Sequence, residues 1–442
     1  MKSFTEEKVL EEGKNSIEFL RREELEKIQV NRLKKTIERA NNSPFYKNIF
    51  KKEGIHPEDI KCIDDIRKLP FTTREDLREN FPFGFIALPL NKIVRVHTST
   101  GTTGKPKAIF FSKKDVNEAA GLIARCMRMT GAGPGDVFQN MMSYGLFTGG
   151  LVFHYGAEKA GVLVIPAGAG NTEKQIELMR DFKTTIVHIT PSYALYLADI
   201  LEEKGIDPEE ELNLQIVYLG AEPYSQKTRE KIEKIYGVNA FNCYGLSEMN
   251  GPGVGFECPL KDGLHIWEDN FILEVVDPLT GEPLPDGKEG ELVLTTINRE
   301  AMPIIRYRTG DITFIYPQVC GCGRTHRKIS PIKGRTDDMF IIKGVNVFPS
   351  EVERVLMDTP EVARNYQIVI ERERSLDIMR IRVEIKKRFF DGSLEHLKEL
   401  QEKIKSKVKS ELMVTPRVEL LEPGTLPRTT GKSKRVIDKR RL

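Results

Sequence analysis

Between about residues 93 and 250, hydrophobic and polar positions switch repeatedly between two spacings. Short apolar runs typical of buried strands are each followed by a segment whose apolar residues have helical spacing. The clearest strand and helix pairs are 162–165 with 173–182, 186–189 with 192–203, and 216–219 with 225–236. Strands that alternate with helices of this length predict βαβ units around a largely parallel sheet.

The segments that flank this region have other patterns. Residues 5–42 carry apolar positions at helical spacing among many charges, which predicts a helical N-terminal layer. Three short strand-like runs separated by Pro and Gly turns follow the sheet region, at 271–276, 289–296 and 312–316. They predict a small β subdomain over about residues 255–334.

The last hundred residues form a further predicted unit. It begins with a strand near 339–342 and a helix 350–358, followed by a hairpin within 366–387 and an amphipathic helix. That helix places on one face Leu394, Leu397, Leu400, Ile404, Val408 and Leu412. The expected fold class is α/β: a large N-terminal α/β domain, 1–334, with mostly parallel sheets and the small β subdomain, then a small mobile α+β C-terminal domain, 335–442.

Composition narrows the class of protein. Of the 442 residues, 39% are hydrophobic and 30% are charged, as in a globular protein. No apolar run approaches the roughly 20 residues that a membrane span needs. Because the N-terminus is charged and contains acidic residues, we expect neither a signal peptide nor a transit peptide. Because the net charge is only +3, a nucleic-acid partner is not indicated. We expect a cytoplasmic protein with no membrane partner.

A loop rich in hydroxyls, glycines and lysines follows the apolar alternation at 93–96. Residues 96–107 read Val-His-Thr-Ser-Thr-Gly-Thr-Thr-Gly-Lys-Pro-Lys. Such a strand-to-loop junction can present backbone N–H groups, hydroxyls and cations to a polyphosphate. It is not a Walker loop, because only two residues separate Gly101 from Gly104 and a proline follows Lys105. A flexible surface loop is the alternative for such a composition.

The string closely resembles the phosphate-binding loop of the adenylate-forming enzymes, which include acyl-CoA synthetases, aryl-CoA ligases and luciferases. The resemblance implies that ATP phosphates are bound by Ser99, Thr100, Gly101, Thr102, Thr103, Gly104 and Lys105. The implied fold is the two-domain α/β architecture expected above.

Three further strings extend the resemblance in chain order. Gly220-Ala221-Glu222-Pro223 is similar to the family's adenine-stacking loop. Tyr244-Gly245-Leu246-Ser247-Glu248 resembles the signature in which the aromatic packs on adenine, the hydroxyl contacts the α-phosphate and the carboxylate holds Mg²⁺. Tyr307-Arg308-Thr309-Gly310-Asp311 resembles the motif whose aspartate binds both ribose hydroxyls.

The C-terminal region carries the rest of the resemblance. Gly334-Arg335-Thr336-Asp337 matches the hinge, where the arginine also reaches the ribose and the C-terminal domain turns about Asp337. Lys343 and Gly344 match the loop that enters the active site for the CoA step. Leu426-Pro427-Arg428-Thr429-Thr430-Gly431-Lys432 resembles the loop with the catalytic lysine, Lys432.

Within that superfamily, four segments resemble the phenylacetate–CoA ligase family: 72–78, 82–84, 144–150 and 154–158. The implied acid pocket contains Met142, Tyr144, Gly145 and Phe147, with the Phe147 ring stacking on an aromatic substrate. Met142 departs from the aromatic residue common at this position. A thioether there changes the shape of a pocket, and an ordinary core role for Met142 stays open.

Two pairs of metal-ligand residues flank the predicted β subdomain. Cys258 and His265 form one pair, and Cys320 and Cys322 form the other. This set suits a closed tetrahedral Cys₃His zinc site, and zinc sites in the resembled subgroup support it. His326 is an alternative nitrogen ligand, and four reduced side chains in ordinary loops are the alternative to a metal.

The resemblance implies an ATP-dependent aryl or arylacetic acid–CoA ligase that works through an acyl-AMP intermediate. Its partners and cofactors are then the aromatic acid, ATP, Mg²⁺ and coenzyme A, with a structural Zn²⁺. Three alternatives stay open: a deazaflavin-adenylating enzyme of the coenzyme F390 synthetase kind, an aryl-acid activator that serves a carrier protein, and a catalytically silent nucleotide-binding module. The oligomeric state is open between a monomer and a homodimer.

Overall fold

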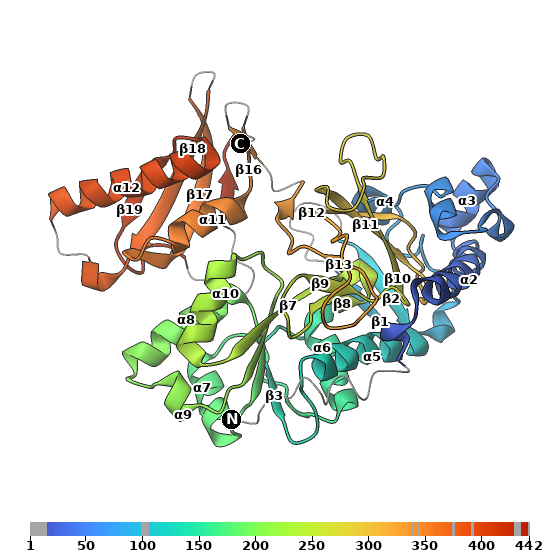
Figure 1. The fold of residues 1–442 in the computed structure, drawn as a ribbon, viewed down its shortest axis with the longest axis horizontal. Coiled ribbons are helices and arrows are strands. Elements are labelled where there is room, and N and C mark those ends of the chain that lie inside the picture. Colours follow the sequence, from blue (N-terminus) through green and yellow to red (C-terminus); the bar gives the residue numbers. More distant parts are fainter. Residues whose placement is uncertain are drawn as a thin grey trace.

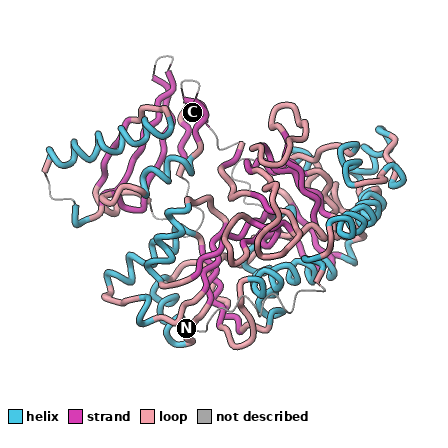
Figure 2. Tube along the Cα trace, in the orientation of Figure 1, coloured by secondary structure: helices cyan, strands magenta, loops and turns pink. Residues whose placement is uncertain are grey.

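The computed structural model describes residues 16–98, 106–336, 340–342, 345–373, 376–389, 393–427 and 435–440. Figure 1 shows a larger body built from the N-terminal and middle residues and a smaller body built from the C-terminal residues, drawn in orange and red. Strands lie inside both bodies and helices lie over them (Figure 2). Among the described helices, none combines the length and the apolar character that crossing a membrane requires.

An eight-stranded sheet forms the middle of the larger body, in the order β13-β9-β8-β7-β6-β5-β3-β4. Its parallel half consists of β3 (Val137–Asn140), β4 (Leu163–Ile165), β5 (Ile186–Ile189), β6 (Ile216–Gly220) and β7 (Asn239–Leu246). Its antiparallel half adds β8 (Gly251–Glu257), β9 (Leu264–Ile266) and β13 (Lys328–Ile329). The predicted parallel sheet and α/β class are confirmed.

Helices cover both faces of this sheet, which explains why its strands read as continuous apolar runs. In β6, Tyr218 belongs to one hydrophobic cluster with Ile123 and Phe153, whereas its neighbour Val217 belongs to another with Ile232. Successive residues of a strand point to opposite faces. The covering helices are α5 (Lys113–Met129), α6 (Thr148–Ala160), α7 (Thr172–Asp181), α8 (Pro191–Glu203), α9 (Pro208–Glu211) and α10 (Gln226–Tyr236).

The helices begin and end at capping residues. Thr190 accepts a hydrogen bond from the Tyr193 N–H at the start of α8, where Pro191 occupies the first turn. Ser225 caps α10 in the same way, and Gly237 ends that helix in the left-handed conformation with φ of 63°. These caps are local signals, so the predicted helices lie within a residue or two of the observed ones.

The N-terminal layer contains α2 (Arg22–Ala40), α3 (Pro44–Glu53) and α4 (Arg74–Glu79), followed by an antiparallel pair, β1 (Ile93–Thr98) and β2 (Ala108–Ser112). Where the structure describes the predicted segment 5–42, α2 confirms its helical character. The helix α3 lies beyond that prediction.

A four-stranded antiparallel sheet forms the small β subdomain, in the order β10-β11-β12-β14. The strands are β10 (Phe271–Val276), β11 (Gly290–Thr296), β12 (Tyr307–Thr313) and β14 (Gly334–Arg335). The prediction of a strand at 312–316 was wrong in both bounds, since β12 begins at Tyr307 and ends at Thr313. The polar stretch from Tyr307 onward is extended because it pairs with β11 on one side and β14 on the other.

The smaller body has its own hydrophobic core. Two strands, β15 (Phe340–Ile342) and β16 (Val345–Val347), precede a four-stranded sheet in the order β19-β18-β17-β20. The remaining elements are α11 (Pro349–Met357), β17 (Val362–Glu373), β18 (Leu376–Ile385), α12 (Leu394–Leu412), β19 (Arg417–Leu421) and β20 (Val436–Asp438). Val352, Ile381 and Ile404 are fully buried in this core. Leu394 lies at the first position of α12 and is 75% exposed, so the apolar face begins later than its sequence pattern predicts.

Candidate functional site

The carboxyl ends of β6 and β7 bring two of the predicted nucleotide strings together. Gly220 ends β6 and pairs with Cys243 in the parallel strand β7, one residue before Tyr244. The turn that follows β6 places Ala221 in the left-handed region with φ of 68°. Ligands of open α/β sheets bind outside the carboxyl ends of their strands, so the loop 220–223 and Tyr244 occupy the expected place for a nucleotide.

Tyr244, Asp311 and Arg335 meet although they come from three strands. The Tyr244 hydroxyl donates to Asp311 Oδ2 over 2.6 Å. The Arg335 guanidinium donates to Asp311 Oδ1 over 2.7 Å and to the Thr309 carbonyl over 3.0 Å. Asp311 and Arg335 are direct partners across β12 and β14. Three residues assigned to adenosine by sequence therefore form one polar corner.

Glu248 is buried in a short 3-10 turn, Ser247–Met249, just after β7. Its carboxylate forms an ion pair with Lys107 and accepts a hydrogen bond of 2.8 Å from the Tyr307 hydroxyl. The buried Arg299 donates over 2.7 Å to the Glu248 backbone carbonyl and over 2.8 Å to that of Phe110. The backbone and the carboxylate of Glu248 are thus held from separate directions.

The surroundings keep Glu248 ionised. Burial raises the pKa of its carboxyl, but the Lys107 ammonium and the hydrogen bonds to the carboxylate outweigh burial, so the net pKa is below its ordinary value. Burial, and then the Glu248 charge, raise the pKa of Tyr307, which therefore keeps its proton and donates. An ionised carboxylate is the hard oxygen ligand that Mg²⁺ prefers.

Three residues that contact Glu248 were not among the predicted site residues. Lys107 ends the loop string and Tyr307 opens the string that ends at Asp311, so adjacency was a usable signal for both. Arg299 belongs to no string, and its role follows only from two carbonyl groups that lie 138 positions apart in the chain (248 − 110).

The expected acid-pocket segment is joined to the nucleotide strings by a side-chain contact. Thr148 begins α6, and its hydroxyl lies 2.7 Å from the hydroxyl of Ser247. Phe147 precedes it at the helix N-cap and is 44% exposed. The end of β1 also reaches this segment, because Thr98 N–H and His97 Nδ1 both donate to the Leu146 carbonyl. Two of the predicted sites are therefore contiguous.

Tyr144 is held by a second polar chain. The buried Asn140 side chain donates to the Tyr144 hydroxyl over 3.0 Å, and that hydroxyl lies 3.3 Å from His154 Nδ1. Burial raises the pKa of Tyr144. Met142 is half-buried and donates its backbone N–H to Asn140 Oδ1. Its neighbour Met141 is buried in a hydrophobic cluster to which Met142 does not belong.

Several predicted site residues lie outside the described residues. These are the loop Ser99, Thr100, Gly101, Thr102, Thr103, Gly104 and Lys105, the hinge Asp337, the CoA-step residues Lys343 and Gly344, and the catalytic lysine Lys432. Gly245 is described and lies in β7 between Tyr244 and Leu246. The roles of all these residues, Gly245 included, stay predictions.

Cys258, His265, Cys320 and Cys322 come together as one cluster. One ligand atom from each residue lies within 4.8 Å of all the others. Cys258 Sγ is 3.7 Å from Cys320 Sγ, and Cys322 Sγ is 3.4 Å from His265 Nε2. Sulfurs at about 2.3 Å from a tetrahedral zinc lie about 3.8 Å apart. The four donors therefore have the chemistry and the spacing of a closed zinc site.

The second nitrogen of His265 settles which histidine faces the cluster. His265 Nδ1 donates over 3.0 Å to the His326 carbonyl, so Nε2 is left for a metal. The His326 Nδ1 accepts from the Glu268 N–H over 3.3 Å, and no His326 atom belongs to the set of ligand atoms that lie within 4.8 Å of one another. His326 is therefore not one of the ligand residues.

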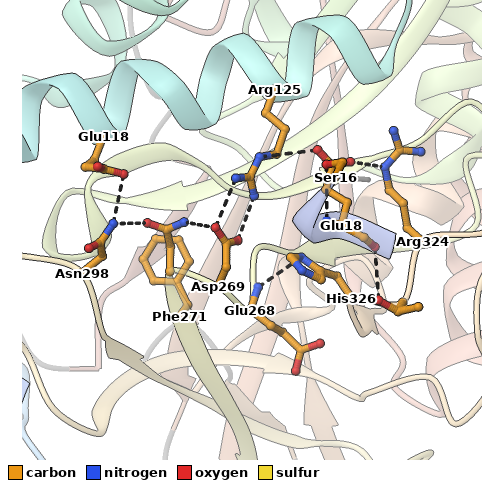
Figure 3. A network of polar contacts seen from close by, with 12 residues as sticks. Ser16, Glu18, Glu118, Arg125, Glu268, Asp269, Phe271, Asn298, Arg324 and His326 are labelled. Atoms are coloured by element: carbon orange, nitrogen blue, oxygen red, sulfur yellow. Dashed lines mark hydrogen bonds and ion pairs between the residues drawn. The ribbon is translucent and has the colours of Figure 1, made fainter. Parts of the chain in front are cut away.

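Figure 3 shows a network of polar contacts that includes Arg324 and His326, which follow Cys322 closely in the chain. Arg125 of α5 lies between Asp269, at 2.8 Å, and Glu18, at 3.5 Å. Arg324, two residues after Cys322, donates to the other oxygen of Glu18 over 2.6 Å. Through Glu18, the loop that contains Cys320 and Cys322 is thereby connected to the N-terminal segment and to helix α5.

Comparison with known proteins identifies the family. The model described as "AMP-binding enzyme" matches residues 52–298, and that described as "AMP-binding enzyme C-terminal domain" matches 344–440. A phenylacetate-coenzyme A ligase of Thermus thermophilus is 46% identical over 96% of this chain and 99% of its own. One of Escherichia coli is 42% identical over 95% of this chain and 96% of its own.

A solved structure shares the arrangement of both bodies. The 2-hydroxyisobutyryl-CoA ligase in its postadenylation state, in complex with 2-HIB-AMP, superimposes with a TM-score of 0.90 at 30% identity, over 96% of this chain and 91% of its own. In its thioesterification state, in complex with 2-HIB-AMP and CoA, the same enzyme superimposes with a TM-score of 0.71 at 30% identity. This match covers 95% of this chain and 91% of that one.

Proposed function

Because this chain belongs to the phenylacetate–coenzyme A ligase family of AMP-binding enzymes, we propose that it joins an aryl or arylacetic acid to coenzyme A at the expense of ATP. The enzyme acts in the cytoplasm through an acyl-AMP intermediate, with a boundary between its two domains near residue 335. The relatives named above carry this activity in their names, and the geometry of the site supports it here.

One observation carries the proposal. The adenosine corner, formed by Tyr244, Asp311 and Arg335, and the buried carboxylate of Glu248 lie along one stretch that continues through the Ser247–Thr148 contact into the acid-pocket segment. An enzyme that adenylates an acid must hold a nucleotide, a phosphate-bound cation and a carboxylate in adjacent positions.

In the first step, an oxygen of the acid's carboxylate attacks the α-phosphorus of ATP, the bond to the β-phosphate oxygen breaks, and pyrophosphate leaves. Asp311 holds the ribose hydroxyls, Glu248 provides the carboxylate for Mg²⁺, and Lys105 and its neighbouring hydroxyls hold the departing phosphates. Bound Mg²⁺ supplies charge neutralisation at those phosphates. Lys432 stabilises the negative charge that develops between the acid and the phosphate.

In the second step, the thiolate of coenzyme A attacks the acyl carbonyl carbon, the bond to the AMP oxygen breaks, and the thiol proton goes to solvent. The C-terminal domain first turns about Asp337, which withdraws Lys432 and brings in Lys343 and Gly344. The similarity to a postadenylation structure supports an arrangement that precedes this turn.

We propose further that Cys258, His265, Cys320 and Cys322 hold a structural zinc ion. Four protein ligands leave no coordination position for substrate, so such a site stabilises the fold and takes no part in the reaction. The metal would connect segments that are 55 positions apart in the chain (320 − 265).

The test of the function is a panel of aromatic and arylacetic acids with purified protein, ATP and Mg²⁺. Pyrophosphate release and thioester formation are measured with and without coenzyme A. The proposal expects a thioester that requires coenzyme A. An adenylated deazaflavin formed regardless of coenzyme A would instead assign the alternative adenylyltransferase activity. Transfer of the acyl group only to a carrier protein would assign the aryl-acid activator.

A further inference from the structure

The aromatic side chain of Phe348, in the smaller body, is buried against the larger one. Phe348 is the N-cap residue of α11 and is only 9% exposed. Its neighbours Val347 and Val352 belong to the core of the smaller body, but among the described clusters Phe348 belongs to none. An apolar ring that is buried outside its own core has its burial partner elsewhere.

The partner is Gly334, in the sheet of the larger body. Gly334 pairs with Ile312 in the β12 and β14 ladder, so its position is fixed by the N-terminal β subdomain. A Cβ atom built on Gly334 would lie 2.2 Å from Phe348 Cδ1 and 2.9 Å from Cγ. Real Cβ atoms do not approach other atoms that closely, so the ring occupies the space that a side chain at 334 would need.

The backbone does not require glycine at this position. Gly334 is not among the glycines with φ between +20° and +160°, and it lies in an extended strand. An alanine could adopt this conformation. The reason for glycine is therefore steric and depends on where Phe348 sits.

Polar contacts surround the ring and connect the same two bodies. The Lys333 ammonium lies 5.7 Å from the centre of the Phe348 ring and 3.7 Å from Glu351 of α11. The Ser350 hydroxyl donates to the Lys333 carbonyl. Together they form a compact contact that exists only while α11 lies beside β14.

The match to solved structures indicates in which arrangement of the two bodies this contact forms. One enzyme at the same 30% identity scores 0.90 in its postadenylation state and 0.71 in its thioesterification state, over nearly the same share of this chain. The arrangement of the two bodies described here is therefore that of the first state. A contact between the bodies near residue 334 belongs to that arrangement.

We propose that insertion of the Phe348 ring over Gly334 is a docking contact specific to the arrangement of the two bodies that precedes the thioester step. Both are positioning residues: the bare backbone at 334 admits the ring, and the ring sets α11 against β14. When the C-terminal domain turns for the thioester step, the ring leaves and the space at 334 is no longer needed. This inference rests on the proposed two-step reaction.

The test separates the two half-reactions in Gly334→Ala. Acyl-adenylate formation, measured as pyrophosphate release, should fall about tenfold or more, because a methyl group forced into a filled space displaces the ring. Thioester formation from supplied acyl-AMP and coenzyme A should stay within about twofold of wild type. Scattering curves of the AMP-bound variant should move away from the wild-type domain arrangement.

Removing the Phe348 ring should relieve the steric clash that Gly334→Ala creates. In Gly334→Ala/Phe348→Ala the added methyl group has room, so adenylation should return to the rate of Phe348→Ala alone, as a coupled pair in a double-mutant cycle. Gly133→Ala is the matched control, because a Cβ there meets no atom within 4 Å and the backbone is not left-handed. It should leave both steps unchanged.

If Gly334→Ala does not fold, Phe348→Trp enlarges the ring from the other side and should give the same selective loss. Equal losses in both half-reactions, or no recovery in the double variant, would overturn the proposal. Failure of the proposed function would look different, since wild-type protein would then release no pyrophosphate with any acid.

Discussion

Both Glu248 and the cluster of Cys258, His265, Cys320 and the half-buried Cys322 lie in the interior of the larger body, but what holds them differs. Glu248 is one carboxylate whose charge is balanced by Lys107 and which accepts from the Tyr307 hydroxyl, while Arg299 donates to its backbone carbonyl. The cluster offers four soft donors within 4.8 Å of one another.

The difference indicates what each centre can do with a metal. A lone carboxylate binds Mg²⁺ weakly and needs the phosphates of a substrate to complete the coordination shell. Four protein donors bind zinc without any substrate and leave no open position. The first centre should govern rate and the second stability, and each prediction below tests that separation.

The largest effect is expected on the catalytic side, from Lys432→Ala. Loss of a charge that stabilises the transition state costs about 3–4 kcal/mol, so acyl-adenylate formation should fall by two or more decades. Thioester formation from supplied acyl-AMP should be affected much less. Rapid-quench assays of each half-reaction measure this, and equal losses in both would remove Lys432 from the adenylation step.

Glu248→Gln should lower adenylation by about a hundredfold, since a neutral amide of the same shape replaces the Mg²⁺ ligand. The Mg²⁺ concentration for half-maximal rate should rise and the zinc content should stay constant, while the melting temperature falls, because the amide no longer balances the buried Lys107 charge. Glu230→Gln, at an exposed position of α10, is the matched control. An unchanged Mg²⁺ dependence of the rate would assign Glu248 a structural role instead.

Cys320→Ser should lower stability and leave nucleotide binding nearly unchanged. We expect about one zinc per wild-type chain by elemental analysis, and a lower zinc content and melting temperature in the variant. The folded fraction should keep nearly normal ATP affinity. Cys62→Ser serves as control because Cys62 is an exposed free thiol far from the cluster in sequence. Metal-free wild-type protein with unchanged melting would contradict a structural zinc.

Tyr244→Phe should have the smallest effect. The variant keeps the ring and removes only the 2.6 Å hydrogen bond to Asp311. A protein hydrogen bond contributes about 1 kcal/mol, so the KM for ATP should rise about fivefold while thermal stability and zinc content stay constant. Steady-state kinetics at varied ATP test this, and an unchanged KM would place the hydroxyl outside nucleotide binding.

Local patterns predicted much of the fold. The strands β5 and β10 were predicted with their observed bounds, because a run of apolar residues reports burial wherever the strand lies. The strand containing Asp311 was not, since its polar residues are extended only through pairing with β11 and β14. Leu394 fits the helical spacing of α12 but lies beyond the surface that the helix covers.

The sequence by itself determined the family, the α/β class and the four members of the Cys/His cluster, and it predicted the residues that bind adenosine, because each rests on residue types at a fixed spacing. Only the tertiary structure decided that Lys107 pairs with Glu248, that Arg299 holds the Glu248 backbone, that His265 rather than the His326 ring faces the cluster, and that Phe348 fills the space over Gly334. Spacing along the chain describes which side chains a segment presents. Which of them meet depends on how distant segments pack, and no local pattern records that.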